Sequence, residues 1–395
     1  MAASGARDAI IVGAGVFGLA LADALLRWGV AVTVLDDGEP AASDTPVGAL
    51  VPLLAAPPGD ALAGLQAEGL CSLPALVARI EGETGVATGY RVIGRITPLG
   101  AEAARSRAEG ALPEAEQRYQ RIAAAQVAAG YAKTEARCVG IEAPWGPPLA
   151  TEAAPAGVLW DRVSARVSAS ALREALTRRV DADPNGRVLR GWPVMRPLPA
   201  ARYGGRAAVI GPRGRIAADA VILAAGWRSA ALLDGANPWV RAEKGQAALL
   251  AAALPLNGPL IQAPGIFVVP HPATDGRSAS VAIGSTREAG KTDLATDEAL
   301  DGVLKRAAAL VPALRDAPIL ALWAGVRPRP ARRLPVVGPI PEKPGLWVAS
   351  GGGGIGIALA PVVAKGLATE IMGGQRTLPA ECIPSAADRS EVPAP

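Results

Sequence analysis

Three glycines near the start of the chain have the spacing of a dinucleotide-binding loop. Gly13, Gly15 and Gly18 follow a short apolar segment and precede an Ala- and Leu-rich stretch. In such a loop the first glycine permits a tight turn, the second lets the backbone approach a pyrophosphate, and the third lets strand and helix pack closely. The phosphates would lie at the positive end of the helix, beside Val16 and Phe17.

Two carboxylates follow at the position where such a fold binds a ribose. The pattern predicts a second strand over 30–35, which ends at Asp36 and Asp37. A carboxylate roughly 20 residues after the glycine loop accepts hydrogen bonds from the ribose diol, and it disfavours a 2′-phosphate such as that of NADP. Strand, glycine loop, helix, second strand and acid together predict a dinucleotide-binding fold.

A second glycine loop lies near the C-terminus. Gly351 to Gly354 follow the apolar segment 346–350 and precede a helical pattern that ends at Ile371. Bare backbone would let a flat ring lie against this loop, and helix N–H groups would stabilise negative charge on a ligand. A flexible linker would not be flanked by an apolar strand and helix. We therefore interpret this loop as part of the same cofactor site.

Composition narrows the class of protein. The 395 residues carry a net charge of +4, which does not favour a nucleic-acid partner, and they are enough for two interlocked domains. Cys71, Cys138 and Cys382 are far apart, and His271 is the single histidine, so we expect no metal site and no hydrolytic triad. The N-terminal apolar run is too short for a signal peptide or membrane span. We expect a cytoplasmic protein.

Apolar periodicity outlines the other elements. Helices are expected over 60–83, 101–129, 164–180 and 296–310. Strands are expected over 90–97, with a bend at Gly94, and over 207–210, 216–223, 247–250, 266–269 and 280–283. From Ser385 the chain is polar and Pro-rich, which predicts a disordered tail over 385–395.

Taken in order along the chain, these motifs resemble those of the D-amino-acid oxidase superfamily of FAD enzymes, and within it the glycine oxidases of thiamine biosynthesis. The resemblance covers nearly the whole chain. The segments that carry it, besides the two glycine loops, are Ala42-Ser43, Gly48-Ala49-Leu50-Val51-Pro52, Ala224-Ala225-Gly226-Trp227, Lys244-Gly245-Gln246, Ile283-Gly284-Ser285-Thr286 and Trp323-Ala324-Gly325-Val326-Arg327-Pro328.

The resemblance implies an α/β fold with two parts. An FAD-binding Rossmann-type domain, a parallel sheet flanked by helices, would comprise residues 1–58, 157–235 and 325–376. An interleaved α+β substrate domain, on a mainly antiparallel sheet, would comprise 59–156 and 236–324.

The resemblance also implies non-covalently bound FAD. Asp36, where the family more often has Glu, would bind the adenosine ribose, and Val194 would touch the adenine. The remaining contacts would come from Ser43, Gly48, Ala49 and Leu50 toward the phosphates and flavin, from Ala225, Gly226 and Trp227 near the phosphate bridge, and from Gly352, Gly353, Gly354, Ile355, Gly356 and Ile357 along the isoalloxazine ring.

Arg327 matches the arginine that binds the substrate carboxylate in this family, and a guanidinium orients a carboxylate through two parallel bonds. Other substrate positions depart from the family pattern. Phe267 stands where glycine oxidases place a tyrosine, Gly265 where they often have a histidine, and the C-terminal loop lacks their His and Arg. The substrate shell therefore differs from that of glycine oxidases, whereas the flavin shell follows the family pattern.

Two positions near Arg327 allow two interpretations each. His271 either lines the pocket as a donor or, as we favour, is a structural turn residue between Pro270 and Pro272. Arg329, with Arg332 and Arg333, either recognises a second acidic group or belongs to a solvated loop, which we slightly favour.

The resulting hypothesis is an FAD-dependent oxidation of an amino acid or secondary amine to the imine, by hydride transfer to flavin N5, with oxygen or another electron acceptor. One alternative is an FAD enzyme acting on a glycine-like modified base in tRNA, and another is a flavin-binding protein without turnover. An NAD-dependent dehydrogenase would not explain the C-terminal glycine loop. Homo-oligomer formation stays open.

Overall fold

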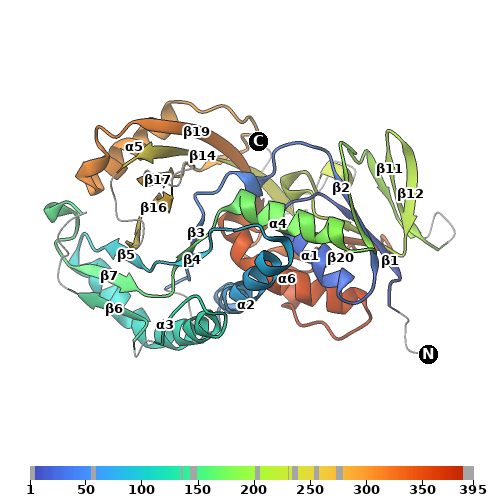
Figure 1. The fold of residues 1–395 in the computed structure, drawn as a ribbon, viewed down its shortest axis with the longest axis horizontal. Coiled ribbons are helices and arrows are strands. Elements are labelled where there is room, and N and C mark those ends of the chain that lie inside the picture. The colour runs from blue at the N-terminus through green and yellow to red at the C-terminus, as the bar shows by residue number, and fades with distance from the viewer. Residues whose placement is uncertain are drawn as a thin grey trace.

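The computed structural model describes residues 5–54, 59–134, 137–142, 149–200, 205–229, 231–233, 239–252, 258–272 and 279–385. The expected disordered tail, from residue 386 onward, lies outside the described residues. Within them, a parallel sheet occupies the right of Figure 1 and a larger sheet the left.

The parallel sheet begins with the N-terminal apolar segment. Five of its strands run parallel, and one edge strand runs antiparallel to its neighbour. These strands are rich in Val, Ile and Leu because helices cover the sheet and leave little of it exposed to water. In spatial order the strands are β20 (Val336–Pro339), β21 (Leu346–Ser350), β13 (Ala220–Leu223), β1 (Asp8–Val12), β2 (Ala31–Asp36) and β9 (Gly186–Arg190).

Apolar helices pack against this sheet. Helix α1 (Val16–Leu26) contacts α4 (Ala169–Ala182) and α6 (Gly356–Ile371), and α6 also packs on α2 (Ala61–Thr84). The helices α2 and α6 approach closely at Gly69, where an added Cβ would lie 1.9 Å from the carbonyl oxygen of Ala358. The α/β class and the dinucleotide-binding sheet expected from the sequence are confirmed.

In the part of the chain that the structure describes, two helices are long and apolar enough to cross a membrane, namely Ala61–Thr84 and Gly353–Ile371. In the most apolar 18-residue stretch of each helix, 50% of Ala61–Thr84 and 67% of Gly353–Ile371 is buried inside the protein. Both pack against each other and against neighbouring helices, as core helices of globular proteins do.

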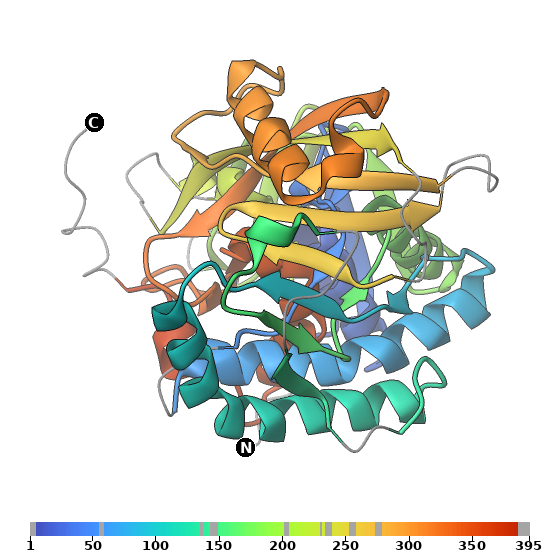
Figure 2. The same cartoon turned by 90° about the vertical axis from the view of Figure 1, so that its left-hand side faces the viewer.

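The large sheet is mainly antiparallel. Helix α5 (Glu298–Leu310) covers one face at β16 and β17, while α3 (Glu102–Ala128) packs against α2 and β6 (Figure 2). In spatial order the strands are β18 (Glu288–Ala289), β14 (Val240–Ala251), β17 (Ala279–Gly284), β16 (Ile266–Pro272), β15 (Leu260–Ala263), β5 (Arg95–Pro98), β7 (Val158–Asp161) and β6 (Val139–Glu142), with β19 (Ile319–Pro330) also paired to β14.

Two small sheets complete the fold. One is a meander of β10 (Arg196–Leu198), β11 (Ala207–Gly211) and β12 (Gly214–Ala218). The other comprises β3 (Ala49–Leu50), β8 (Ala165–Arg166) and β4 (Arg91–Val92).

Three expected elements are divided in the structure. The strand expected over 216–223 is β12 and β13 in different sheets, because the chain turns at Asp219, whose N–H donates to Asp8. The strand expected over 90–97 is β4 and β5, which separate at Gly94 with a φ of +71°. The helix expected from 164 begins only at Ala169, after β8, with Ser168 as its N-cap.

Two of the expected domain boundaries fall at places where the large sheet continues. The boundary before residue 157 puts β7 in the FAD-binding part, although β7 pairs with β5 and β6 of the large sheet. The boundary at 324/325 falls inside β19, which pairs with β14 along its whole length. Residues 325–330 therefore belong to the large sheet.

Candidate active site

The N-terminal glycine loop is shaped by close backbone contacts. Gly13 has a φ of +108°, and a Cβ there would lie 2.5 Å from the carbonyl oxygen of Ala224 on the next strand. A Cβ on Gly18 would lie 2.1 Å from the oxygen of Gly13. At Gly15, by contrast, an added Cβ would meet only the Ser43 hydroxyl, at 3.7 Å. The loop is thus tight against the sheet and open at the start of α1, as a phosphate site requires.

The hydroxyl of Ser43 lies at the N-terminus of α1 and binds one of its free N–H groups. Ser43 lies in a 3-10 turn (Ala42–Asp44), and its Oγ accepts a hydrogen bond from the N–H of Val16 at 3.0 Å. The hydroxyl proton stays available for a second acceptor. Phe17, one residue further, contacts the C-terminal loop, because a Cβ on Gly352 would lie 3.1 Å from its ring.

The two predicted ribose acids differ in their surroundings. Asp36 ends β2 and is partly buried, and its Oδ2 accepts a hydrogen bond from Arg173 at 3.0 Å. Asp37 is exposed, and its carboxylate accepts the N–H of Glu39 at 3.0 Å within its own turn. Asp36 is therefore the better placed of the two.

The segment Gly48–Leu50 runs beside the large sheet. Gly48 has a φ of +80°, a Cβ there would lie 2.2 Å from the oxygen of Val167, and Ala49 and Leu50 pair with β8. His271 lies in strand β16, not in a turn, and its Nε2 is 2.9 Å from the oxygen of Val47. The turn that we favoured from the two prolines is wrong, because both prolines continue the strand. His271 thus contacts the backbone just before Gly48.

The remaining predicted cofactor contacts lie around the end of β13. Ala225, Trp227 and Val194 pack against one apolar cluster, which includes Leu35. The oxygen of Gly226 accepts a hydrogen bond from Ser350 Oγ at 2.8 Å.

The C-terminal glycine loop lies where β21 ends. Gly353, with a φ of +50°, and Gly354 leave bare backbone, since an added Cβ would meet nothing closer than 3.9 Å. Ile355 and Ile357 pack partly buried against the main core, and Gly356 begins α6.

One face of the large sheet gathers the predicted substrate residues. Strand register pairs Phe267 with Gly284, Gly284 with Ala247, and Ala247 with Trp323. Directly paired residues share a face, and so do residues two apart along a strand. Phe267, His271, Arg327 and Arg329 therefore all face the same way. This is the face toward Val47, because a Cβ on Gly284 would lie 2.7 Å from the Val47 side chain.

Arg327 is held by three neighbours on this face. Its Nη2 donates to the hydroxyl of Ser285, its Nη1 donates to the oxygen of Thr286 at 3.1 Å, and its Nη1 lies 3.5 Å from Glu243 Oε1. Burial lowers the pKa of the Arg327 guanidinium, Glu243 opposes this decrease and Arg287 adds to it. A guanidinium has five N–H donors, so donors are left for a carboxylate ligand.

Arg329 does not lie in a solvated loop as we had favoured. It belongs to β19, and its Nη1 donates to Glu243 Oε2 at 2.6 Å, while just over half of its side chain is exposed. Glu243, whose side chain is 9% exposed, therefore lies between two arginines. Sequence reasoning missed Glu243, because only the register of β14 with β19 places it opposite Arg327.

Strand β19 brings the three cofactor segments together. A Cβ on Gly325 would lie 1.8 Å from the Thr45 hydroxyl, two residues after Ser43. Pro330, further along, is the neighbour that a Cβ on Gly351 would meet at 3.1 Å. The strand also contacts the turn Gly226–Ser229. Arg327 thus lies on a strand that touches the loops following β2, β13 and β21.

The family model described as "FAD dependent oxidoreductase" (DAO) matches residues 8–370. The chain belongs to this family. It is an FAD-dependent oxidoreductase, and the bare backbone at Gly15, Gly353 and Gly354 fits the cofactor that the family binds.

Several relatives are similar to this family member. Glycine oxidase of Pseudomonas aeruginosa is 36% identical over 169 residues, which cover 42% of this chain and 45% of that protein. The tRNA 5-methylaminomethyl-2-thiouridine biosynthesis bifunctional protein of Paracidovorax citrulli is 32% identical over 417 residues, covering 94% of this chain and 58% of its own length. Both matches span less than two thirds of the relative.

The crystal structure of glycine oxidase from Geobacillus kaustophilus shares the fold. The TM-score is 0.80 at 24% identity, and the match covers 97% of this chain and 99% of that one.

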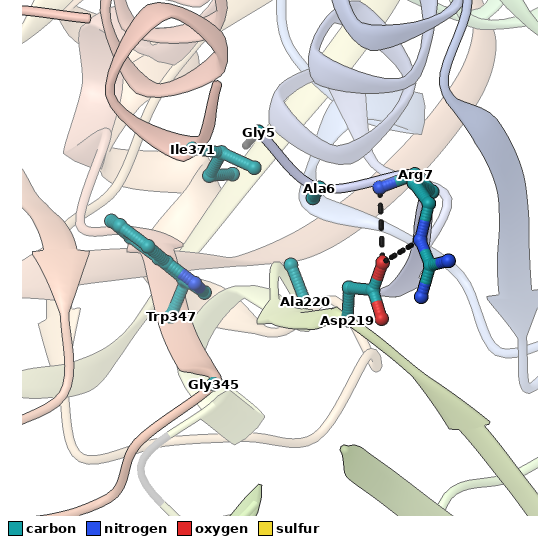
Figure 3. A pocket seen from close by; sticks show the side chains of 8 residues that line it. All are labelled: Gly5, Ala6, Arg7, Asp219, Ala220, Gly345, Trp347 and Ile371. Atoms are coloured by element: carbon teal, nitrogen blue, oxygen red, sulfur yellow. Dashed lines mark hydrogen bonds and ion pairs between the residues drawn. The ribbon is translucent and has the colours of Figure 1, made fainter. Parts of the chain in front are cut away.

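A separate cavity of about 440 Å³ lies at the opposite, N-terminal edge of the parallel sheet. Figure 3 shows Trp347 and Ile371 on one side of it and the Arg7–Asp219 ion pair on the other. The lining residues include none of the predicted cofactor or substrate residues, so the cavity is separate from the candidate active site.

Proposed function

We propose that this enzyme oxidises the amine of an amino acid or a secondary amine to the imine, and that Arg327 binds the substrate carboxylate. The observation that carries the proposal is the position of Arg327. It lies on the strand that contacts all three cofactor segments, and its side chain, 20% exposed, is oriented by Ser285 and Thr286.

In this proposal the cofactor residues keep the roles assigned above. The start of α1 with Ser43 would hold the phosphates, Asp36 the ribose, and the residues from Gly352 to Ile357 the flavin ring. When bound, FAD would supply the acceptor for a hydride from the carbon that carries the amine. Hydrolysis of the resulting imine would release ammonia from an amino acid or a primary amine from a secondary amine, and oxygen or another acceptor would take the electrons.

The protein's own contribution is orientation and exclusion of water. Arg327 fixes the carboxylate through parallel N–H bonds, so that the neighbouring carbon has one orientation. Phe267 lies on the same sheet face and supplies an apolar wall. No strong base is required, since the amine binds neutral and its carbon gives up the hydride. We place the reaction in the cytoplasm, with a small molecule as the substrate.

The test is reduction of the bound flavin without oxygen. The purified protein is mixed anaerobically with glycine, sarcosine, D-alanine, D-proline or iminodiacetate, and the visible spectrum is recorded. The proposal is supported if one of these compounds bleaches the flavin of the wild type and the bleaching is strongly reduced in Arg327→Ala. Arg315 is an exposed arginine outside the site, so Arg315→Ala should bleach like the wild type.

A tRNA base is the second candidate substrate. The match over 94% of this chain to a tRNA-modifying bifunctional protein favours it. It predicts tRNA binding that weakens steeply with salt. If the protein is yellow, is reduced by no free amine and binds tRNA with this salt dependence, the tRNA base replaces the small amine as the proposed substrate. A yellow protein that neither substrate class reduces would be a flavin-binding protein without turnover.

A further inference from the structure

Arg173 joins three segments of the nucleotide site through one guanidinium. It lies in the second turn of α4. Its Nε donates to the oxygen of Ala14 at 2.8 Å, and its Nη2 donates to Asp36 Oδ2 at 3.0 Å. Its Nη1 lies 3.0 and 2.9 Å from the two carboxylate oxygens of Asp44. All three nitrogens are therefore used, and each is used for a different segment.

These segments are the ones that would surround the ADP half of FAD. Ala14 lies between two glycines of the phosphate loop. Asp36 is the candidate ribose acid, and Asp44 follows Ser43, whose hydroxyl binds the start of α1. Arg173 consequently ties the candidate ribose carboxylate to the phosphate loop through contacts within the protein.

Arg173 also neutralises the negative charges of Asp36 and Asp44. Asp36 and Asp44 carry two negative charges beside a site for a diphosphate, and like charges at close range oppose binding. The three side chains are partly buried, with 22%, 13% and 26% exposed for Arg173, Asp36 and Asp44, so water screens them incompletely. Without Arg173, the Asp44 carboxylate would still accept the N–H of Ala41 at 2.9 Å, but its negative charge next to Ser43 would lose the guanidinium that neutralises it.

We propose that Arg173 is a positioning residue for the ADP half of FAD. It orients Asp36 toward the ribose and neutralises Asp44 beside the diphosphate. The inference rests on the assignment of FAD to these loops, and it is independent of which amine the enzyme oxidises.

The test measures nucleotide affinity on the full chain after removal of FAD. FAD is titrated by quenching of its fluorescence, and ADP is used as a competitor that probes the nucleotide half alone. We expect Arg173→Met to weaken both by roughly 10- to 100-fold, as for loss of a hydrogen-bonded charged partner, and Arg173→Lys to lie between. Arg178 lies on the same helix, is exposed and forms an ion pair with Glu174, so Arg178→Met should bind like the wild type.

A charge rescue separates positioning from mere packing. Asp44→Asn in the Arg173→Met background removes the negative charge that is no longer neutralised, so it should recover a large part of the lost ADP affinity. A purely structural role of Arg173 predicts no such recovery. Unfolding of each FAD-free variant is followed by circular dichroism, and Arg173→Lys serves where Arg173→Met does not fold.

Two results would overturn the inference: wild-type affinity of both Arg173 variants for FAD and ADP, or a double variant no better than Arg173→Met. Tight FAD binding with no reduction by any amine would count against the proposed function alone. Weak ADP binding by the wild type itself would remove the assignment of FAD to these loops and, with it, this inference.

Discussion

The guanidinium of Arg327 lies directly over Gly245, which is two residues along β14 from Glu243, the residue that pairs with Arg327. A Cβ on Gly245 would be 2.2 Å from Nη2 and 2.4 Å from both Cζ and Nη1 of Arg327. The pairing Gly245–Gly325 in the strand register leaves this part of the sheet without side chains. Arg327 can therefore cross the strand and reach Ser285 and Thr286, which orient it.

Gly245→Ala should displace Arg327 with little effect on the fold. The new Cβ would meet the guanidinium of Arg327, which is the end of a flexible side chain and can move away. In the displaced position the guanidinium no longer has the geometry that binds the substrate carboxylate. We expect KM for the amine substrate to rise roughly tenfold, equivalent to about 1.4 kcal/mol. The FAD spectrum and thermal unfolding should stay close to wild type. An unchanged KM would show that Gly245 does not set the position of Arg327.

Glu243→Gln should strengthen the binding of carboxylate ligands. Glu243 competes with a ligand for Arg327 and also binds Arg329 at 2.6 Å. Removing its charge leaves two guanidiniums on this face, so the Kd for acetate, measured by its effect on the flavin spectrum, should fall roughly 3- to 10-fold. Arg329→Gln should raise that Kd instead. Weaker acetate binding in Glu243→Gln would mean that Glu243 chiefly holds Arg327 in place.

His271 should make the stability of the protein depend on pH. Burial lowers its pKa, nearby Arg166 adds to the decrease, and the bond to Val47 opposes it. The folded state thus binds the proton less readily than the unfolded state, whose histidine has a pKa of about 6.5. Stability is therefore full above about pH 6.5 and decreases as the pH falls below it, by at most about 1.4 kcal/mol per pH unit.

Urea unfolding at pH 7.5 and 5.5 measures this effect. His271→Gln should have a smaller difference between the two pH values, because no other histidine is present in the chain. Equal differences in wild type and variant would contradict the assignment to His271.

Gly48→Ala should reduce both stability and FAD retention. Gly48 and Gly29 have nearly the same φ, +80° and +78°, but only at Gly48 does a Cβ meet backbone, 2.2 Å from the oxygen of Val167. Gly29→Ala should cost about 1–2 kcal/mol for the left-handed conformation alone. Gly48→Ala must in addition separate the segment that begins β3 from Val167. Thermal unfolding and the FAD content after gel filtration report the two effects, and equal losses in both variants would exclude the steric argument.

The candidate cofactor loops could be proposed from the sequence because the determinants of their shape are local. The loop at Gly13–Gly18 needs glycine for contacts with its own strand and helix, and Asp36 follows at a fixed place in the chain. Such short-range requirements fix the spacing of the glycines and the acid along the sequence, so the pattern can be recognised there. The same holds for helices α2, α3 and α5, whose apolar periodicity gave bounds within two residues of those observed.

The surroundings of the substrate site depended on tertiary structure. Glu243 lies 84 positions before Arg327 in the chain, and Arg173 lies 137 positions from Asp36. Only strand register and helix docking bring these charges together, and neither leaves a pattern of spacing. The same is true of His271, whose flanking prolines suggested a turn, whereas pairing with β17 keeps all three residues in a strand. The sequence alone thus determined the dinucleotide-binding loop and the α/β fold class, and its family resemblance indicated FAD. Long-range packing decided which charged side chains meet at the site, because electrostatic partners are chosen by proximity in space.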